Sequence, residues 1–286
     1  MLIYILYFYI YIKLHLKNNI WTKSYNNYLL LKEYNGIFMK NKLINNPNIN
    51  YDHVNHPKIK GIQIIGGKNN FPISWLNQQG YCEYSLYLQY FKGIKTLPTQ
   101  AMVIGTKEHQ KLEDKFKEDA VPTTFDEIIQ TSKEEASLSR EMFVVAPKFG
   151  IRGFIDEIWM TPDEFVIIDD KPGKISYPST INQVLAYCLA FKSMLNSDFQ
   201  DHQSTLTSLK KDNSLKEDNR KIKAALRERG TDNIFWIEEF DESNEEKIKF
   251  LINRMHGLFK GSKPFIPTKN PNKCNKCRFQ SYCEHF

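Results

Sequence analysis

The sequence lacks an apolar run long enough to cross a membrane. Its longest run of apolar and tyrosine residues, MLIYILYFYIYI, ends at Lys13, whereas a membrane-spanning helix needs about 18 residues or more. No basic segment precedes this run and no small-residue cleavage site follows it, so a secretory signal is not indicated either. We therefore expect a cytoplasmic protein without stable membrane insertion. A membrane-contacting segment at residues 1–16 is the open alternative.

The sequence also has little net charge outside its first 50 residues. The formal net charge is +6, and residues 1–50 hold six Lys and one Glu, which leaves 33 basic and 32 acidic residues in the other 236. Overall basicity is therefore no argument for nucleic-acid binding. We expect residues 1–50 to be a poorly ordered leader or a mis-assigned start, with Met39 as one candidate initiator.

A disulfide framework is lacking as well. The five cysteines are odd in number, and three of them lie within the last 13 residues, which suits a metal or cluster site in a reducing compartment. The C-terminal spacing is C-x2-C-x5-C, with one distant fourth cysteine; these four are Cys82, Cys274, Cys277 and Cys283. Thiolates at this spacing bind either zinc or an iron–sulfur cluster. Cys188 lies in an apolar helical pattern and is expected to be a core residue.

The remaining residues, 51–286, are predicted to form one mixed α/β domain. A hydrophobic content of 41% is sufficient for a large core and excludes collagen-like and wholly disordered chains. Hydrophobic patterns predict strands within 141–150, 151–160, 163–171 and 233–241, and helices within 71–93, 105–119, 179–195 and 242–261. The polar segments 121–138 and 196–220 are predicted to be connections.

Two aspartates and a lysine on neighbouring predicted strands are the strongest functional signal. Side chains alternate along a strand, so Asp169 and Lys171 share one face while Asp170 points away. Asp156, on the preceding strand, can reach the same point. Two carboxylates beside a lysine suit metal-assisted phosphodiester hydrolysis, because carboxylates hold Mg²⁺ or Mn²⁺ and the metal activates water. A hairpin with a solvent-exposed salt bridge is the alternative for an isolated D-x-K.

Other residues strengthen the catalytic interpretation. His109 follows Gly105 near the start of a predicted helix. Gln183 and Tyr187 are four residues apart and so share a helix face, from which they can bond the lysine and a phosphate backbone. Four arginines are further candidates for phosphate contact, namely Arg140, Arg152, Arg227 and Arg229.

The order Gly105…His109, Gly153-x-x-Asp156, Asp169-x-Lys171 and Gln183-x-x-x-Tyr187 resembles the PD-(D/E)xK nuclease superfamily. Within it, the sequence is most similar to the RecB-like CRISPR-associated exonucleases and their stand-alone relatives. The resemblance covers residues 71–286 and implies a restriction-endonuclease-like core, a mixed central sheet flanked by helices. It implies Mg²⁺ or Mn²⁺ ligands at His109, Asp156, Asp169 and the carbonyl of Asp170. The catalytic set that it implies is Asp156, Asp169, Lys171, Gln183 and Tyr187.

The same resemblance implies a 4Fe-4S cluster as a second cofactor. Its ligands would be Cys82, Cys274, Cys277 and Cys283, and residues 274–283 would staple the C-terminal tail to the N-terminal helix. A zinc site is the alternative, although zinc ribbons normally use two C-x-x-C pairs and this sequence has one.

We therefore expect a divalent-metal-dependent DNA exonuclease. The resemblance implies single-stranded DNA ends as substrate, a role in CRISPR spacer acquisition or DNA repair, and CRISPR integrase proteins or a helicase as partners. The alternative is a non-catalytic subunit that binds DNA ends or assembles a repair or integration complex. The presence of Asp156, Asp169 and Lys171 together argues against that alternative.

Overall fold

The structure is a computed structural model that describes residues 39–44, 53–196 and 218–286. The expected leader, apart from residues 39–44, and most of the expected connection 196–220 lie outside this part. The strands are β1 (Lys40–Ile44), β2 (His53–Asn55), β3 (Gln63–Ile65), β4 (Lys68–Pro72), β5 (Val121–Thr123), β6 (Ser137–Ala146), β7 (Ile151–Met160), β8 (Glu164–Lys171), β9 (Lys221–Glu228) and β10 (Ile234–Glu239). The helices are α3 (Ser74–Tyr81), α4 (Glu83–Leu86), the π-helix η1 (Tyr87–Phe91), α5 (Gln100–Asp119), α6 (Phe125–Thr131), α7 (Pro178–Leu195), α8 (Glu242–Phe259), α9 (Pro271–Asn275) and the 3₁₀-helix η3 (Gln280–Tyr282).

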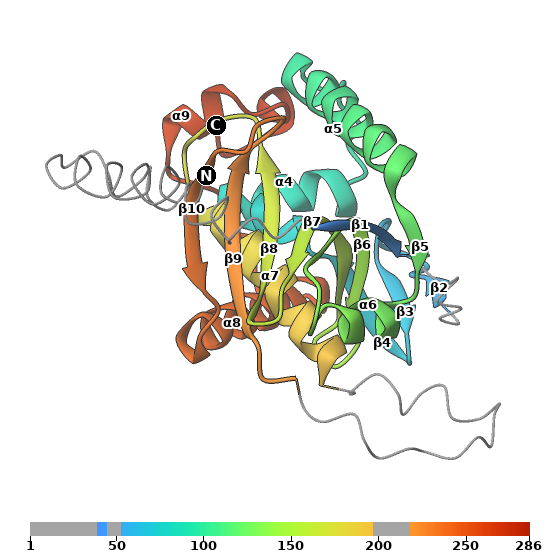
Figure 1. The fold of residues 1–286 in the computed structure, drawn as a ribbon. Coiled ribbons are helices and arrows are strands. Elements are labelled where there is room, and N and C mark those ends of the chain that lie inside the picture. Colours follow the sequence, from blue (N-terminus) through green and yellow to red (C-terminus); the bar gives the residue numbers. More distant parts are fainter. Residues whose placement is uncertain (1–38, 45–52, 197–217) are drawn as a thin grey trace, which may run out of the picture.

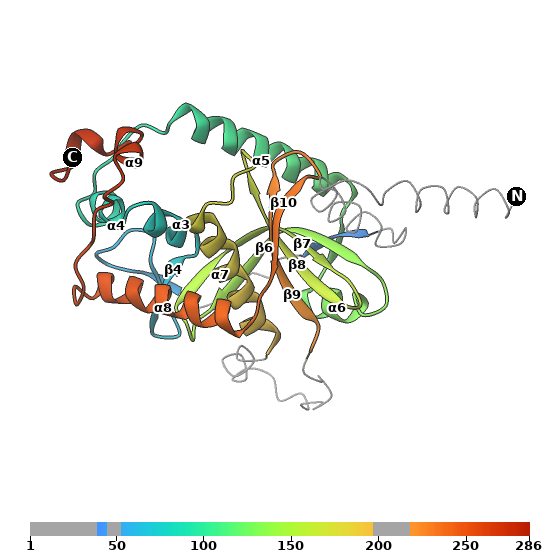
Figure 2. The ribbon, with the colours of Figure 1, turned by 90° about the vertical axis from the view of Figure 1, so that its left-hand side faces the viewer.

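These strands form one mixed, curled sheet with helices around it (Figure 1). β6, β7 and β8 form an antiparallel meander, and β9 pairs in parallel with β8. Figure 2 shows α5 along the top of the molecule and α8 along the bottom, with the sheet and α7 between them. The mixed α/β architecture predicted from the sequence is therefore confirmed.

Helix α7 lies at the centre of the hydrophobic core. It contacts β6, β7, β8 and β9 as well as α3 and α8, and twelve of its residues are buried. Because it is covered by the sheet on one side and by helices on the other, its sequence is apolar over most of its circumference. Among the described residues, no helix is both long enough and apolar enough to span a membrane.

The helix predicted for 71–93 is interrupted in the middle. Cys82 has an extended backbone (φ −168°, ψ 115°) and separates α3 from α4. Its sulfur accepts a hydrogen bond of 3.4 Å from the backbone N–H of Thr268, in the C-terminal tail. The C-terminal tail therefore contacts the chain at the point where the predicted helix is interrupted. The helical periodicity of the sequence did not indicate this interruption.

Other element boundaries also differ from the sequence predictions. α5 begins at Gln100 and not at Gly105, because the Thr99 side chain caps it by accepting from the N–H of Met102. The segment predicted as a connection contains β5 and α6, and α6 starts with a capping box between Thr124 and Glu127. The short strands β2, β3 and β4 were not predicted, since they consist of only three to five residues each.

Two arginines and two carboxylates form a buried ion-pair network on the sheet face opposite α7. Arg227 Nε lies 2.8 Å from Asp170 Oδ1, and Arg227 Nη1 lies 2.6 Å from Glu157 Oε1. Arg140 contacts the same two carboxylates. Burial alone would raise the pKa of Asp170, but the guanidinium groups of Arg227 and Arg140 hold that pKa below its usual range. The network therefore balances the charge of the buried carboxylates on the face of β8 that is directed away from α7.

We predict that Arg227→Met lowers the free energy of unfolding by about 3–5 kcal/mol, because it leaves two buried carboxylates short of a partner. Urea denaturation measures the change. The matched control is Lys221→Met, which removes an exposed pair with Glu239 and should cost less than about 1 kcal/mol. Equal costs for the two substitutions would contradict a structural role of the network.

Candidate active site

The pairing of β7 with β8 brings two aspartates and a lysine together. Extending the β7–β8 register by one pair beyond Glu157–Ile168 sets Asp156 opposite Asp169, and Asp156 Oδ2 accepts a hydrogen bond of 2.8 Å from the backbone N–H of Asp170. Lys171 Nζ lies 2.6 Å from Asp169 Oδ2. The side chain of Asp170 lies on the opposite face, in the ion-pair network. Side chains at the end of β8 thus alternate between the two faces of the sheet, as the sequence predicts.

The first half of α7 contributes the glutamine and the tyrosine of the predicted site. Lys171 Nζ donates a hydrogen bond of 3.3 Å to Gln183 Oε1. The Tyr187 ring packs against β7 at Gly153, where a Cβ atom would lie 2.8 Å from Cε1 of the ring. Gly153 therefore has a steric role in the Gly153-x-x-Asp156 motif, because a larger residue would displace the tyrosine.

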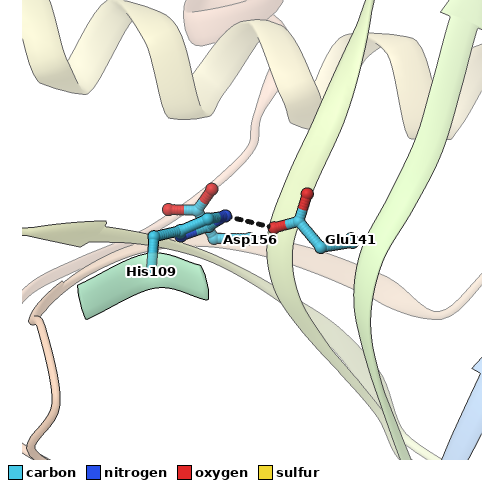
Figure 3. Close-up of side chains that lie close together, drawn as sticks. All are labelled: His109, Glu141 and Asp156. Carbon is cyan, nitrogen blue, oxygen red and sulfur yellow. Dashed lines mark ion pairs between the residues drawn. The ribbon is translucent and has the colours of Figure 1, made fainter. Parts of the chain in front are cut away.

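Helix α5 brings His109 to the same place, next to a carboxylate that the sequence analysis did not include. His109 Nε2 lies 2.6 Å from Glu141 Oε1, and Figure 3 shows the two side chains directed toward each other. One ligand atom each from His109, Glu141 and Asp156 forms a set whose members all lie within 4.8 Å of one another. Asp169, a predicted ligand, is not a member of this set, but its carboxyl contacts that of Asp156. Glu141 is thus an additional candidate ligand or positioning group.

Glu141 reaches the site through an irregularity in the β6–β7 ladder. The pairing is regular on both sides but skips Glu141 and Asp156 themselves. Glu141 has φ 51°, in the left-handed region that residues other than glycine rarely adopt. Arg140 and Met142 would share a face in a regular strand, yet Arg140 lies in the ion-pair network and Met142 in the core against α7. In the sequence, the only sign is a charged residue within a largely apolar stretch.

The site collects more negative than positive charge. Burial raises the pKa of Asp169 to about 7, with Lys171 opposing and Asp156 adding to the shift. Burial also raises the pKa of Asp156. The pKa of His109 is raised chiefly by its hydrogen bond to Glu141. A divalent cation would relieve this repulsion, and oxygen and imidazole donors suit Mg²⁺ or Mn²⁺, so the residues fit such a metal.

The four arginines considered for phosphate contact are placed differently. Arg140 and Arg227 are engaged in the ion-pair network. Arg152 donates to a backbone carbonyl between β2 and β3 at 2.9 Å. Arg229 lies at the end of β8, where its Nη2 is 3.2 Å from the carbonyl oxygen of Asp170. Of these four, Arg229 is therefore the one that lies at the end of β8 without belonging to the ion-pair network.

The cysteines of the predicted cluster meet in a second site. Four of them line one pocket between α4 and the C-terminal tail, namely Cys82, Cys274, Cys277 and Cys283. No disulfide joins any of the five cysteines. Among the described residues, no three cysteine sulfurs lie within 4.8 Å of one another. Cys188 is fully buried in the core, as predicted.

Hydrogen bonds fasten the C-terminal tail to the helices α3 and α4 (Figure 2). The hydroxyl of Tyr81 donates to the carbonyl of Lys273 at 2.5 Å. The carboxylate of Glu83 is bound by Arg254 at 2.5 Å and accepts from the N–H of Ile266 at 3.0 Å. The tail is therefore held on both sides of Cys82 by contacts that do not involve the cysteines.

We predict that Asp169→Asn stabilises the metal-free protein at pH 8. Burial raises the folded-state pKa to about 7, above the ordinary value of an aspartate, so the stability of the unsubstituted protein falls as the pH rises from about 4 to about 7. Asparagine does not titrate, so the gain in Tm should be largest at pH 8 and should shrink toward pH 5.

Differential scanning fluorimetry in EDTA measures this gain, and each kcal/mol corresponds to about 2–4 °C for a chain of this size. The control is Asp163→Asn, in an exposed turn, whose Tm difference should not change with pH. A Tm for Asp169→Asn below that of the unsubstituted protein at pH 8 would contradict the prediction.

Comparison with known proteins identifies the family. The sequence profile described as "PD-(D/E)XK nuclease superfamily" matches residues 105–284, which include the carboxylate site and the three C-terminal cysteines. No curated protein matches the sequence. A solved structure titled "Crystal structure of SSO0001" is 15% identical, with a TM-score of 0.40, and the match covers 76% of this chain and 86% of that chain. Because the profile spans more than half of its residues, the chain belongs to the PD-(D/E)XK nuclease superfamily.

Proposed function

We propose that the protein is a divalent-metal-dependent DNA exonuclease of the RecB-like branch, acting on single-stranded ends. Membership of a nuclease superfamily indicates nuclease activity on DNA. The observation that carries the finer proposal is the convergence of Asp156, Asp169, Lys171 and His109 from three separate elements. A subunit that only binds DNA ends has no chemical need for this set of residues.

The proposed mechanism is hydrolysis, in which one P–O ester bond breaks and water supplies the new oxygen. A bound Mg²⁺ or Mn²⁺ would lower the pKa of that water and neutralise charge on the phosphate. His109, Asp156, Asp169 and the carbonyl of Asp170 are the proposed ligands, with Glu141 holding the imidazole of His109. Such a carboxylate partner fixes the orientation of a ligating histidine.

Lys171 is the proposed catalytic lysine. Its ammonium has three N–H donors; it forms an ion pair with Asp169 and donates one hydrogen bond to Gln183. Its remaining donors are proposed to serve the attacking water or a phosphate oxygen. Gln183 therefore orients the lysine, and Tyr187 closes the site against β7.

We predict that Lys171→Ala lowers cleavage of labelled single-stranded DNA by at least about 100-fold in Mn²⁺ or Mg²⁺, which is the range for losing one group that stabilises charge in a transition state. EDTA should abolish cleavage by the unsubstituted protein. The matched control is Lys174→Ala, three residues further along. Its side chain is 61% exposed and pairs with Glu228 at 3.3 Å, so activity should be retained.

Linear and circular single-stranded DNA of the same sequence test the requirement for ends. Cleavage of the linear form alone supports an exonuclease. A protein that binds DNA but cuts neither form with either metal would support the alternative of an assembly subunit. Co-purification with CRISPR integrase proteins or with a helicase would test the two proposed roles, spacer acquisition and repair.

The second part of the proposal is a 4Fe-4S cluster in the cysteine pocket. The four cysteines line one pocket, and their single C-x-x-C pair differs from the two such pairs of zinc ribbons, which favours a cluster. Backbone N–H groups of Thr268 and Phe279 lie 3.4 Å from the sulfurs of Cys82 and Cys277, and such contacts are typical of cluster ligands.

We predict that protein purified without oxygen is brown and contains about four irons per chain, the number in a 4Fe-4S cluster. Cys277→Ser should lose most of the iron and the visible absorption. The control Cys188→Ala, in the core, should keep both. A colourless protein with stoichiometric zinc would overturn the cluster and leave the catalytic proposal unaffected.

A further inference from the structure

Arg229 lies directly beyond the strand that runs parallel to the catalytic β8. β9 pairs with β8 up to Glu228, opposite Lys171. The backbone N–H of Arg229 then donates to the carbonyl of Lys171 at 2.8 Å, and its Nη2 donates to the carbonyl of Asp170 at 3.2 Å. Two bonds thus hold this arginine at the end of β8, which carries the catalytic carboxylate and lysine.

The guanidinium of Arg229 also meets the helix that carries His109. A Cβ atom at Gly105 would lie 2.8 Å from Arg229 Nη1, so the absence of a side chain there leaves the space that the guanidinium fills. Gly105 precedes His109 by four residues, about one helical turn. Arg229 therefore lies between the His109 turn of α5 and the end of β8.

Arg229 retains hydrogen-bond donors, unlike the arginine two positions earlier. Arg227 uses Nε, Nη1 and Nη2 on Asp170 and Glu157. In Arg229, Nη2 has the carbonyl of Asp170, whereas Nε is buried without a hydrogen-bond partner among the described residues. Nη1 has only a loose ion pair of 3.8 Å with Glu108, whose side chain is 52% exposed. Arg229, whose side chain is 15% exposed, therefore has donors that the described residues leave without a close acceptor.

We propose that Arg229 binds the phosphate group that is cleaved and that Gly105 provides the space for its guanidinium; this deepens the proposed nuclease function and rests on it. The planar guanidinium presents N–H donors in a fork that matches phosphate oxygens. Its contact with the carbonyl of Asp170 uses one of two lone pairs and leaves the other for a metal.

The first test is the kinetics of cleavage. Arg229→Ala should lower kcat/KM by about 100-fold or more, as expected for losing one charge-stabilising donor group. Arg229→Lys should recover little, since a point charge cannot replace the fork. The matched control, Lys115→Ala, removes the same charge from an exposed position of α5 and should cut at the unsubstituted rate.

Gly105→Ala separates the binding role from a structural one. The atom that a new methyl group would meet is the far end of a flexible side chain, so the fold can accommodate it, and alanine favours a helix over glycine. We predict an unchanged or raised Tm together with a loss of activity similar to that of Arg229→Ala. In the double variant, the two losses should not add, because both act through one guanidinium.

A binding measurement tests the proposal without catalysis. In EDTA, the affinity for a short single-stranded oligonucleotide should fall in Arg229→Ala. The slope of the logarithm of affinity against the logarithm of salt concentration should become shallower by about 0.7, the value for one phosphate contact on single strands. Lys115→Ala again serves as the control for a change in total charge.

Full activity of Arg229→Ala, or losses that add in the double variant, would overturn the proposal. A loss of activity in Arg229→Ala that only follows a loss of Tm would also overturn it, because Arg229 would then stabilise the fold and not bind phosphate. Failure of the unsubstituted protein to cut DNA with either Mg²⁺ or Mn²⁺ would contradict the nuclease function. In that case an unchanged salt slope in Arg229→Ala also rejects the phosphate contact, whereas a shallower slope retains it.

Discussion

Two adjacent carboxylates at the end of β8 must be compensated on opposite faces of the sheet. Strand alternation sends Asp169 toward α7 and Asp170 toward the opposite face. Arg227 and Arg140 neutralise Asp170 within a buried network, whereas Lys171 is the single lysine paired with Asp169. Burial raises the pKa of Asp169, and the neighbouring Asp156 adds to this rise. A divalent cation bound at the site would offset the negative charge of the two aspartates.

The irregular β6–β7 ladder is the second constraint on the site. A regular ladder would keep Glu141 and Asp156 within the pleat of the sheet, but the register runs from Arg140–Glu157 to Met142–Ile155 and does not include Glu141 opposite Asp156. Glu141 adopts a positive φ, a strained conformation of a kind that clusters at functional sites. This strain brings a carboxylate to His109 and completes a compact set of ligand atoms.

The C-terminal tail and α3–α4 depend on each other. The break at Cys82 gives the tail a backbone and a sulfur to contact, and the bonds made by Glu83 connect α4 to α8 and the tail. α3 in turn packs on α7, the helix that presents Gln183 and Tyr187. Contacts made by residues 264–286 are thereby linked to the wall of the carboxylate site, more than 75 residues away in sequence.

The sequence by itself determined the elements with strong periodicity and the residues whose order forms a motif. Local pattern alone predicts the apolar strands β7 and β8, the buried helix α7 and the Asp169-x-Lys171 alternation. Side chains return to the same face every two residues in a strand and every 3.6 residues in a helix, so the apolar positions reveal which element is present. Tertiary structure decided what local pattern does not encode. It placed Glu141 in the site through a strained backbone, gave Arg227 the carboxylate and Arg229 the backbone carbonyl of Asp170 as partners, and interrupted a helix at Cys82. Each depends on contacts between residues far apart in the chain, where packing overrides local preference.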